Sequence, residues 1–118
     1  YAAELGWDWR MLAAVIYQES RFSIGSRSFR GATGLMQVMP QTGAAYEVND
    51  LIDPEQNLFA GTSHLKRLQK LYSSCDMSDE ERIRFTLAAY NAGEGRIKDC
   101  RKDIHTDFPV QTNTLWQQ

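Results

Sequence analysis

One segment constrains the fold more than any other: residues 53–73 predict a long helix. The segment opens with Asp53-Pro54-Glu55, which combines a capping side chain, a proline at the first helical position and an acidic first turn. Apolar and small side chains then recur at helical spacing, namely Leu58, Thr62, Leu65, Leu68 and Tyr72. Side chains at this spacing are typical of a helix packed into a core.

Two more helical signals precede this segment. Residues 8–20 carry apolar side chains at helical spacing, and Asp8 is placed to cap the start of that helix. We expect its core-facing side to consist of apolar or small residues, namely Trp9, Leu12, Ala13, Ile16 and Ser20. Pro40 is placed to open a short helix that runs to Tyr46.

The C-terminal part follows the same organisation. Ser78-Asp79-Glu80-Glu81 is a capping box that predicts a helix running to Asn91, and Gly93 suits a left-handed helix end. A short helix is expected over residues 94–102, whereas residues 104–118 show no period. Because no segment alternates like a strand, the sequence predicts a compact all-α domain of about five helices.

Length and composition exclude several classes of protein. The 118 residues suffice for one domain with a real core, and 42% hydrophobic and 24% charged residues are ordinary for a globular protein. A formal net charge of -2, with scattered basic residues, gives no basis for nucleic-acid binding. No apolar run is long enough to span a bilayer, and no signal peptide is visible. Tyr1 already falls within a helical pattern, so we expect a domain excised from a longer chain.

The two cysteines, Cys75 and Cys100, leave two alternatives open. They are far apart and no histidine sits at ligand spacing, so we expect no metal site and no cofactor. They are either buried thiols or the ends of one disulfide, which would close a loop of about 25 residues. An extracytoplasmic location would favour the disulfide.

Glu19 is the candidate catalytic residue. It stands near the end of the helix predicted over residues 8–20, between apolar turns and a glycine-rich stretch. Desolvation there would raise its pKa, and a general acid near neutral pH requires a raised pKa. Taken alone, this segment favours a solvated glutamate at a helix end, and two other segments change the balance.

Three segments combine small and polar residues in a way that core packing alone would not select: Glu19-Ser20-Arg21-Phe22, residues 31–40, and Ala88-Ala89-Tyr90-Asn91-Ala92-Gly93. Gln37 and Asn91 each offer a donor and an acceptor, which suits amides and hydroxyls. Tyr90 and Met39 offer apolar contact with the carbon face of a sugar. Together these groups suit an uncharged, amide-bearing carbohydrate.

In this order and at these intervals, the three segments resemble the family 1 lytic transglycosylases of bacterial cell walls, which have a goose-type lysozyme-like fold. The resemblance runs from Tyr1 to about Arg101 and includes the Asp53-Pro54-x-x-Asn57-Leu58-x-x-Gly61 helix start. The opening Gly6-Trp7-Asp8-Trp9-Arg10 and the Gly93-x-Gly95 stretch are most similar to the C-terminal catalytic module of a membrane-bound branch. The resemblance implies a catalytic domain over residues 1–103, and the absence of any period over residues 104–118 predicts an irregular tail there.

The resemblance also implies roles for single residues. Glu19 matches the single catalytic acid/base of the family, and Ser28 matches a serine that helps to orient its carboxyl. The other substrate-binding positions that it implies are Gln37 and Met39 in the sugar subsite, and Tyr90 and Asn91 facing the carboxyl across the cleft.

The loop between Phe22 and Gly31 departs from the family pattern. Ser26 stands where alanine is common, and Arg27 and Arg30 add charge. This departure puts the shape of the loop, and with it the aim of Ser28, in question.

The implied reaction is cleavage of the MurNAc-β-1,4-GlcNAc bond of peptidoglycan without water, which leaves 1,6-anhydro-MurNAc ends. Glycosidases ordinarily use two carboxylates, whereas the three segments contain only that of Glu19. A lyase whose substrate supplies the nucleophile fits a single carboxylate. The alternatives are a goose-type lysozyme-like hydrolase of the same bond and a non-catalytic peptidoglycan-binding module.

The resemblance further implies a location in the periplasm or cell envelope, with anchoring to the outer membrane through parts absent from this chain. The expected partners are peptidoglycan glycan strands and no nucleic acid, and we expect a monomer.

Overall fold

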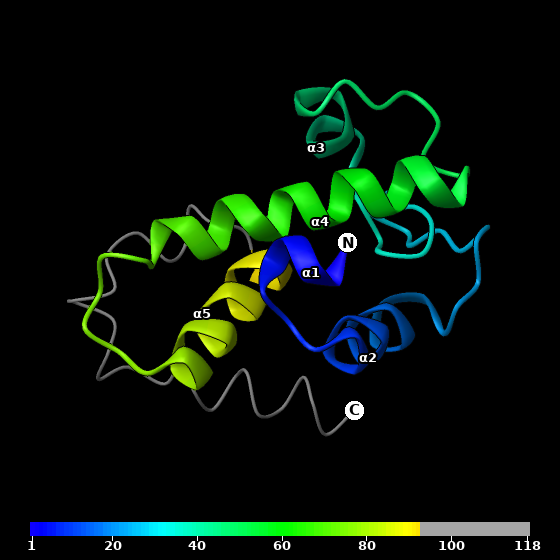
Figure 1. Ribbon diagram of the computed structural model, residues 1–118. Helices are drawn as coiled ribbons and strands as arrows, with labels where there is room; N and C mark the ends of the chain where they lie inside the picture. The colour runs from blue at the N-terminus through cyan, green and yellow to red at the C-terminus, as the bar shows by residue number, and fades with distance from the viewer. Residues whose placement is uncertain (93–118) are drawn as a thin grey trace. The chain divides into compact units, whose positions relative to one another are not determined.

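The computed structural model describes residues 1–92 of the chain, and the regular structure within them is helical (Figure 1). The helices are α1 (Ala2–Leu5), α2 (Trp9–Ser20), α3 (Pro40–Ala45), α4 (Pro54–Leu71) and α5 (Asp79–Ala92). The prediction of an all-α domain is confirmed. The helix expected over residues 94–102, the Gly93 helix end and the tail over residues 104–118 lie outside the described residues.

The chain divides into two compact units, Tyr1–His64 and the part from Leu65 onward. The first unit holds α1, α2, α3 and the beginning of α4, and it contains Glu19. The second holds the end of α4 and all of α5.

Helix α2 begins as its sequence predicts. The Asp8 carboxylate accepts a hydrogen bond from the Arg10 backbone N–H at 2.8 Å, which caps the first turn. The same carboxylate also binds the Arg10 guanidinium through Nε at 3.1 Å and Nη2 at 3.0 Å. These charge-assisted hydrogen bonds lower the pKa of Asp8.

The expected buried face of α2 is wrong at Trp9. Its side chain is 69% exposed because the first turn lies at the surface, beside the exposed Asp8 and Arg10. Trp7, which precedes the helix, is buried instead at 8% exposure. Within the helix the buried residues are Leu12, Val15 and Ser20.

Helix α4 anchors the loops of the first unit through Asn57, whose side chain is fully buried. The Asn57 Oδ1 accepts a hydrogen bond from the backbone N–H of Met36 at 2.8 Å. Its Nδ2 donates to the carbonyl oxygens of Thr33 and Leu51, each also at 2.8 Å. Asn57 therefore has a structural role, since it joins α4 to two loop segments of the first unit.

The loop that Asn57 anchors approaches α4 too closely for side chains at two positions. Gly34 has a φ of 81°, and a Cβ there would run into the Asn57 amide and the Leu51 carbonyl. A Cβ at Gly61 would meet the side chain of Met36, which is completely buried. Glycine is therefore required at both places for the loop to lie against the helix.

The second unit has a core of its own, formed by Leu68, Tyr72, Cys75, Phe85, Ala88 and Ala89. The rings of Tyr72 and Phe85 pack with centroids 5.6 Å apart. The capping box forms as predicted, since the Ser78 Oγ accepts from the Glu81 N–H at 3.1 Å. Cys75 is disulfide-bonded, and Cys100, the other cysteine of the sequence, lies outside the described residues.

Candidate acid–base site

Glu19 lies on the buried side of α2. It follows Leu12 by seven residues, Val15 by four and Ile16 by three, so the helix brings all four side chains to one face. Burial raises the pKa of Glu19 from 4.5 to about 7. Within residues 1–92 no hydrogen bond or ion pair contributes to this shift.

A carboxyl with a pKa of about 7 exists in comparable amounts as acid and as base at neutral pH. The protonated form can donate a proton to a leaving group, and the ionised form can then accept one. A solvated glutamate at a helix end would be almost fully ionised at this pH. Glu19 is therefore equipped to perform both halves of a proton-transfer cycle.

The chain turns sharply where it leaves Glu19. Arg21 and Phe22 both adopt left-handed backbone conformations, with φ of 54° and 64°. The Ser23 N–H donates to the Ser20 carbonyl at 3.0 Å, and the Ser26 N–H donates to the Ser23 carbonyl at 3.3 Å. Left-handed conformations are costly for side chains as bulky as phenylalanine and often occur at functional sites.

Ser28 lies in a tight turn of this loop. Its Oγ accepts from the Ala32 N–H at 3.0 Å, and its own N–H donates to the Ala32 carbonyl at 2.8 Å. Within the described residues no hydrogen bond joins Ser28 to Glu19. The orienting role expected for Ser28 stays a prediction.

Gln37 holds the loop in a way that the sequence did not indicate. Its Nε2 donates to the carbonyl oxygens of Ser26 at 3.1 Å and Gly34 at 3.0 Å. These bonds require an unusual backbone, and Gln37 has a φ of 49°. Because Nε2 donates to these two backbone carbonyls, Oε1 is the atom of the Gln37 amide that can bind a sugar. Met39, the neighbouring candidate, is half-buried just before α3.

Tyr90 and Asn91 lie near the end of α5, in the second unit. Tyr90 is half-buried and packs against the core of that unit, whereas Asn91 is exposed. The expectation that both face Glu19 stays a prediction.

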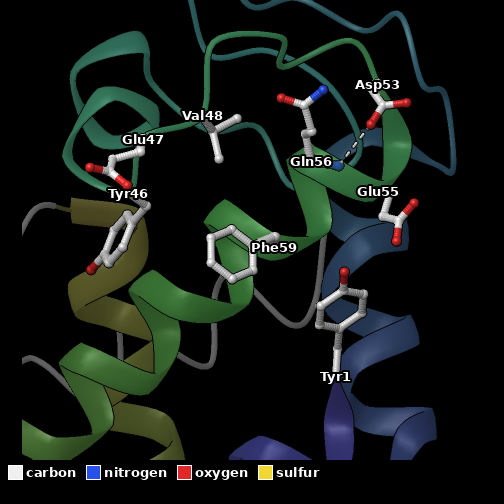
Figure 2. Close-up of a pocket in the computed structure, with 8 residues that line it drawn as sticks. All are labelled: Tyr1, Tyr46, Glu47, Val48, Asp53, Glu55, Gln56 and Phe59. Atoms are coloured by element: carbon white, nitrogen blue, oxygen red, sulfur yellow. Dashed lines mark hydrogen bonds between the residues drawn. The ribbon is translucent and has the colours of Figure 1, made fainter.

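A separate hollow of about 590 Å³ lies between the end of α3 and the first turns of α4 (Figure 2). Three carboxylates and three aromatic rings are among the residues that line it, namely Glu47, Asp53, Glu55, Tyr1, Tyr46 and Phe59. Asp53 already caps α4, since its Oδ2 accepts from the Gln56 N–H at 3.0 Å. No residue of the predicted site lines this hollow.

Two features that would indicate other functions do not occur in the described part of the chain. Residues 1–92 contain no group of three or more His, Cys, Asp or Glu side chains that could hold a metal ion. No helix among them is both long enough and apolar enough to cross a membrane.

The fold is a helical domain, and the raised pKa of its buried Glu19 carboxyl suits that group to acid–base chemistry. The family model described as "Transglycosylase SLT domain" matches residues 1–107, and the chain belongs to this family. The family resemblance seen in the sequence is thereby confirmed.

Two relatives carry the name membrane-bound lytic murein transglycosylase F. The protein from Desulfosudis oleivorans is 42% identical over 98 residues, which cover 82% of this chain and 21% of the relative. The protein from Serratia proteamaculans is 41% identical over 102 residues, or 86% of this chain and 20% of the relative. The chain thus spans about a fifth of the length of these relatives.

A solved structure shares the fold. The 70 kDa soluble lytic transglycosylase SLT70 from Escherichia coli aligns with 72% of this chain at a TM-score of 0.59 and 34% sequence identity. The match covers 14% of that larger protein. The lysozyme-like fold predicted from the sequence is confirmed.

Proposed function

We propose that the protein is a peptidoglycan lytic transglycosylase in which Glu19 acts as the single acid and base. The observation that carries the proposal is the burial of Glu19, which raises its pKa to about 7. Family membership and the names of the relatives, lytic murein transglycosylases, support the choice of substrate.

The cleavage uses the two protonation states of Glu19 in turn. Protonated Glu19 gives its proton to the glycosidic oxygen between MurNAc and GlcNAc, and the bond from MurNAc C1 to that oxygen breaks. The N-acetyl carbonyl oxygen of the MurNAc then bonds to C1 and stabilises the positive charge that develops there.

The second half of the reaction restores the enzyme. The Glu19 carboxylate removes the proton of the MurNAc C6 hydroxyl, and O6 displaces the N-acetyl oxygen from C1. A 1,6-anhydro ring closes, Glu19 is protonated again, and no water is consumed. A pKa close to the working pH suits both steps because neither protonation state is scarce.

The remaining candidates would bind the substrate. Ser28, Gln37, Met39, Tyr90 and Asn91 are the proposed contacts, and Gln37 would offer Oε1 to a sugar hydroxyl or amide. Because the relatives are called membrane-bound murein enzymes, the proposed location is the cell envelope. A periplasmic position with an outer-membrane anchor is the finer proposal.

The test is Glu19→Gln, which keeps the size of the side chain and removes its acid–base function. Purified peptidoglycan should yield 1,6-anhydromuropeptides with the wild-type protein and none with this variant. Glu4→Gln is the matched control, since Glu4 is an exposed carboxyl on α1. It should release wild-type amounts of product, and normal turnover by Glu19→Gln would refute the proposed role.

Mass spectrometry separates this function from its rivals, because an anhydro end is one water lighter than a reducing end. Products with reducing ends would identify a hydrolase. Binding of peptidoglycan with no cleavage by the wild-type protein would identify a binding module.

A further inference from the structure

The loop that follows Glu19 has a charge opposite to that of the chain as a whole. From Ser20 to Tyr46 the sequence contains three arginines, Arg21, Arg27 and Arg30, and no acidic residue. The whole chain has a formal net charge of -2. We call residues 21–30 the arginine loop.

The backbone of the arginine loop is fixed at several points. The Ser26 carbonyl accepts hydrogen bonds from the Gly34 N–H at 2.7 Å and from the Gln37 side chain at 3.1 Å. Arg27 pairs with Thr33 in a short antiparallel bridge. The Gly31 N–H closes the turn around Arg30 by donating to the Ser28 carbonyl at 3.0 Å. The loop therefore presents its charges from defined backbone positions.

Arg27 and Arg30 are exposed and have no acidic partner among residues 1–92. They also do not act on Glu19, because burial accounts for its pKa shift without any contribution from a nearby charge. Arg21 differs from these two arginines because its guanidinium already has a partner. It lies over the Tyr17 ring, 5.6 Å from the ring centroid. Two guanidinium groups close in sequence to Glu19 are thus available to a ligand.

Exposed apolar side chains alternate with these charges. Phe29 is 99% exposed and lies between Arg27 and Arg30 in the sequence, and Phe22 is 55% exposed. The Phe22 ring is held 5.7 Å from the Tyr17 ring, between centroids. A ligand of the loop should therefore combine anionic groups with small apolar ones.

We propose that the arginine loop binds the carboxylates of the stem peptides on peptidoglycan and so favours peptide-bearing glycan strands over bare ones. The inference rests on the proposed function, which brings a glycan strand to Glu19. Stem peptides carry free carboxylates, which arginine binds with paired hydrogen bonds, and alanine methyl groups, which suit exposed phenylalanine rings. The position of the loop directly after Glu19 favours this ligand over an anionic lipid surface.

The test compares two soluble substrates, glycan strands with their stem peptides and the same strands stripped by an amidase. The double variant Arg27→Gln/Arg30→Gln should lose about threefold to tenfold in kcat/KM on peptide-bearing strands, as expected for two exposed ion pairs. Its kcat/KM on stripped strands should change by less than about twofold. The wild-type preference should also shrink as salt is raised.

Arg10→Gln is the matched control, because it removes one exposed arginine at the opposite end of α2 from Glu19. It should leave the preference for peptide-bearing strands unchanged. Equal losses on both substrates by the double variant, or no loss on either, would overturn the proposal. Wild-type binding to phosphatidylglycerol vesicles that the double variant loses, with the peptide preference intact, would also overturn it and assign the loop to a membrane surface.

Binding measured in the Glu19→Gln background separates this proposal from the proposed function. Adding Arg27→Gln/Arg30→Gln to that variant should weaken binding of peptide-bearing strands by a similar factor, whether or not the wild-type protein cleaves them. If the wild-type protein released no anhydro product, the proposed function would fail while this binding difference still reported on the loop.

Discussion

The side-chain amide of Gln37 donates a hydrogen bond to the Ser26 carbonyl oxygen at 3.1 Å and thereby ties the loop that follows Glu19 to the segment from Gly34 to Gln37. The same nitrogen donates to the Gly34 carbonyl at 3.0 Å, so both of its hydrogens are used. Gln37 therefore positions the loop through its Nε2, independently of any contact between its Oε1 and a substrate.

Gln37→Glu should loosen this loop locally. The substitution replaces a nitrogen that donates to two carbonyls with an oxygen that repels them, at a cost of about 1–3 kcal/mol. Amide hydrogen exchange should become at least about tenfold faster at Gly34, whose N–H bonds the Ser26 carbonyl at 2.7 Å. Gln41→Glu, the same change at an exposed position of α3, should leave this rate unchanged. Unaltered exchange at Gly34 in Gln37→Glu would contradict the positioning role.

Asn57→Ala should lower the stability of the whole first unit. The substitution removes the Asn57 hydrogen bonds to the Met36 N–H and to the carbonyls of Thr33 and Leu51 in a fully buried place, and the Thr33 carbonyl keeps only its bond from the Val38 N–H. Loss of three buried hydrogen bonds should cost about 3–5 kcal/mol, measured as the free energy of unfolding in urea. Gln56→Ala, at the exposed preceding position, provides the control and should cost less than about 1 kcal/mol. A loss of similar size in both variants would show that Asn57 is not the anchor.

Trp7 and Trp9 form a matched pair that tests where the core begins. Trp7 is 8% exposed and Trp9 is 69% exposed, although they lie two residues apart. Trp7→Ala should destabilise the protein by about 3–5 kcal/mol, whereas Trp9→Ala should change the free energy of unfolding by less than about 1 kcal/mol. Equal effects, or the reverse order, would contradict the burial seen here.

The sequence predicted those parts of the fold that depend on neighbouring residues. The caps of Asp8, Asp53 and Ser78 act within three residues of themselves, so the starts of α2, α4 and α5 could be placed from local chemistry alone. The exposure of Trp9 could not be predicted from the sequence, because helical periodicity gives the direction of a side chain but not whether another element covers it.

In the candidate site, too, some features could be predicted from neighbouring residues and others depend on tertiary contacts. The burial of Glu19 could be predicted only in part, because it continues the stripe of Leu12 and Ile16 whereas its segment taken alone favoured a solvated glutamate at a helix end. The hydrogen bonds from the Gln37 side chain to the backbone could not be predicted. They occur with Gln37 in a left-handed conformation, and nothing in the Gly-Leu-Met-Gln sequence indicates that conformation for the glutamine. A motif identifies such a residue, whereas tertiary contacts decide which of its atoms remain for a ligand.

Glu19→Gln should stabilise the protein at neutral pH and leave its stability unchanged in acid. The folded-state pKa of Glu19 is about 7 and its ordinary value is 4.5, so between these two pH values the folded protein holds a proton that the unfolded chain has lost. The contribution of Glu19 to wild-type stability therefore falls as the pH rises through this window. Above pH 7 the buried charge costs up to about 3 kcal/mol, which glutamine avoids.

The measurement is the difference in free energy of unfolding between Glu19→Gln and the wild type, from urea titrations at several pH values. It should be near zero at about pH 4, grow between about pH 4.5 and 7, and then level off. Glu4→Gln, an exposed change of the same kind, should show no such growth. A difference that stayed flat across this range would mean that Glu19 is not desolvated in the folded protein. The proposed acid–base cycle would then lose its physical basis, because an ordinary glutamate would be ionised at working pH and unable to donate the first proton.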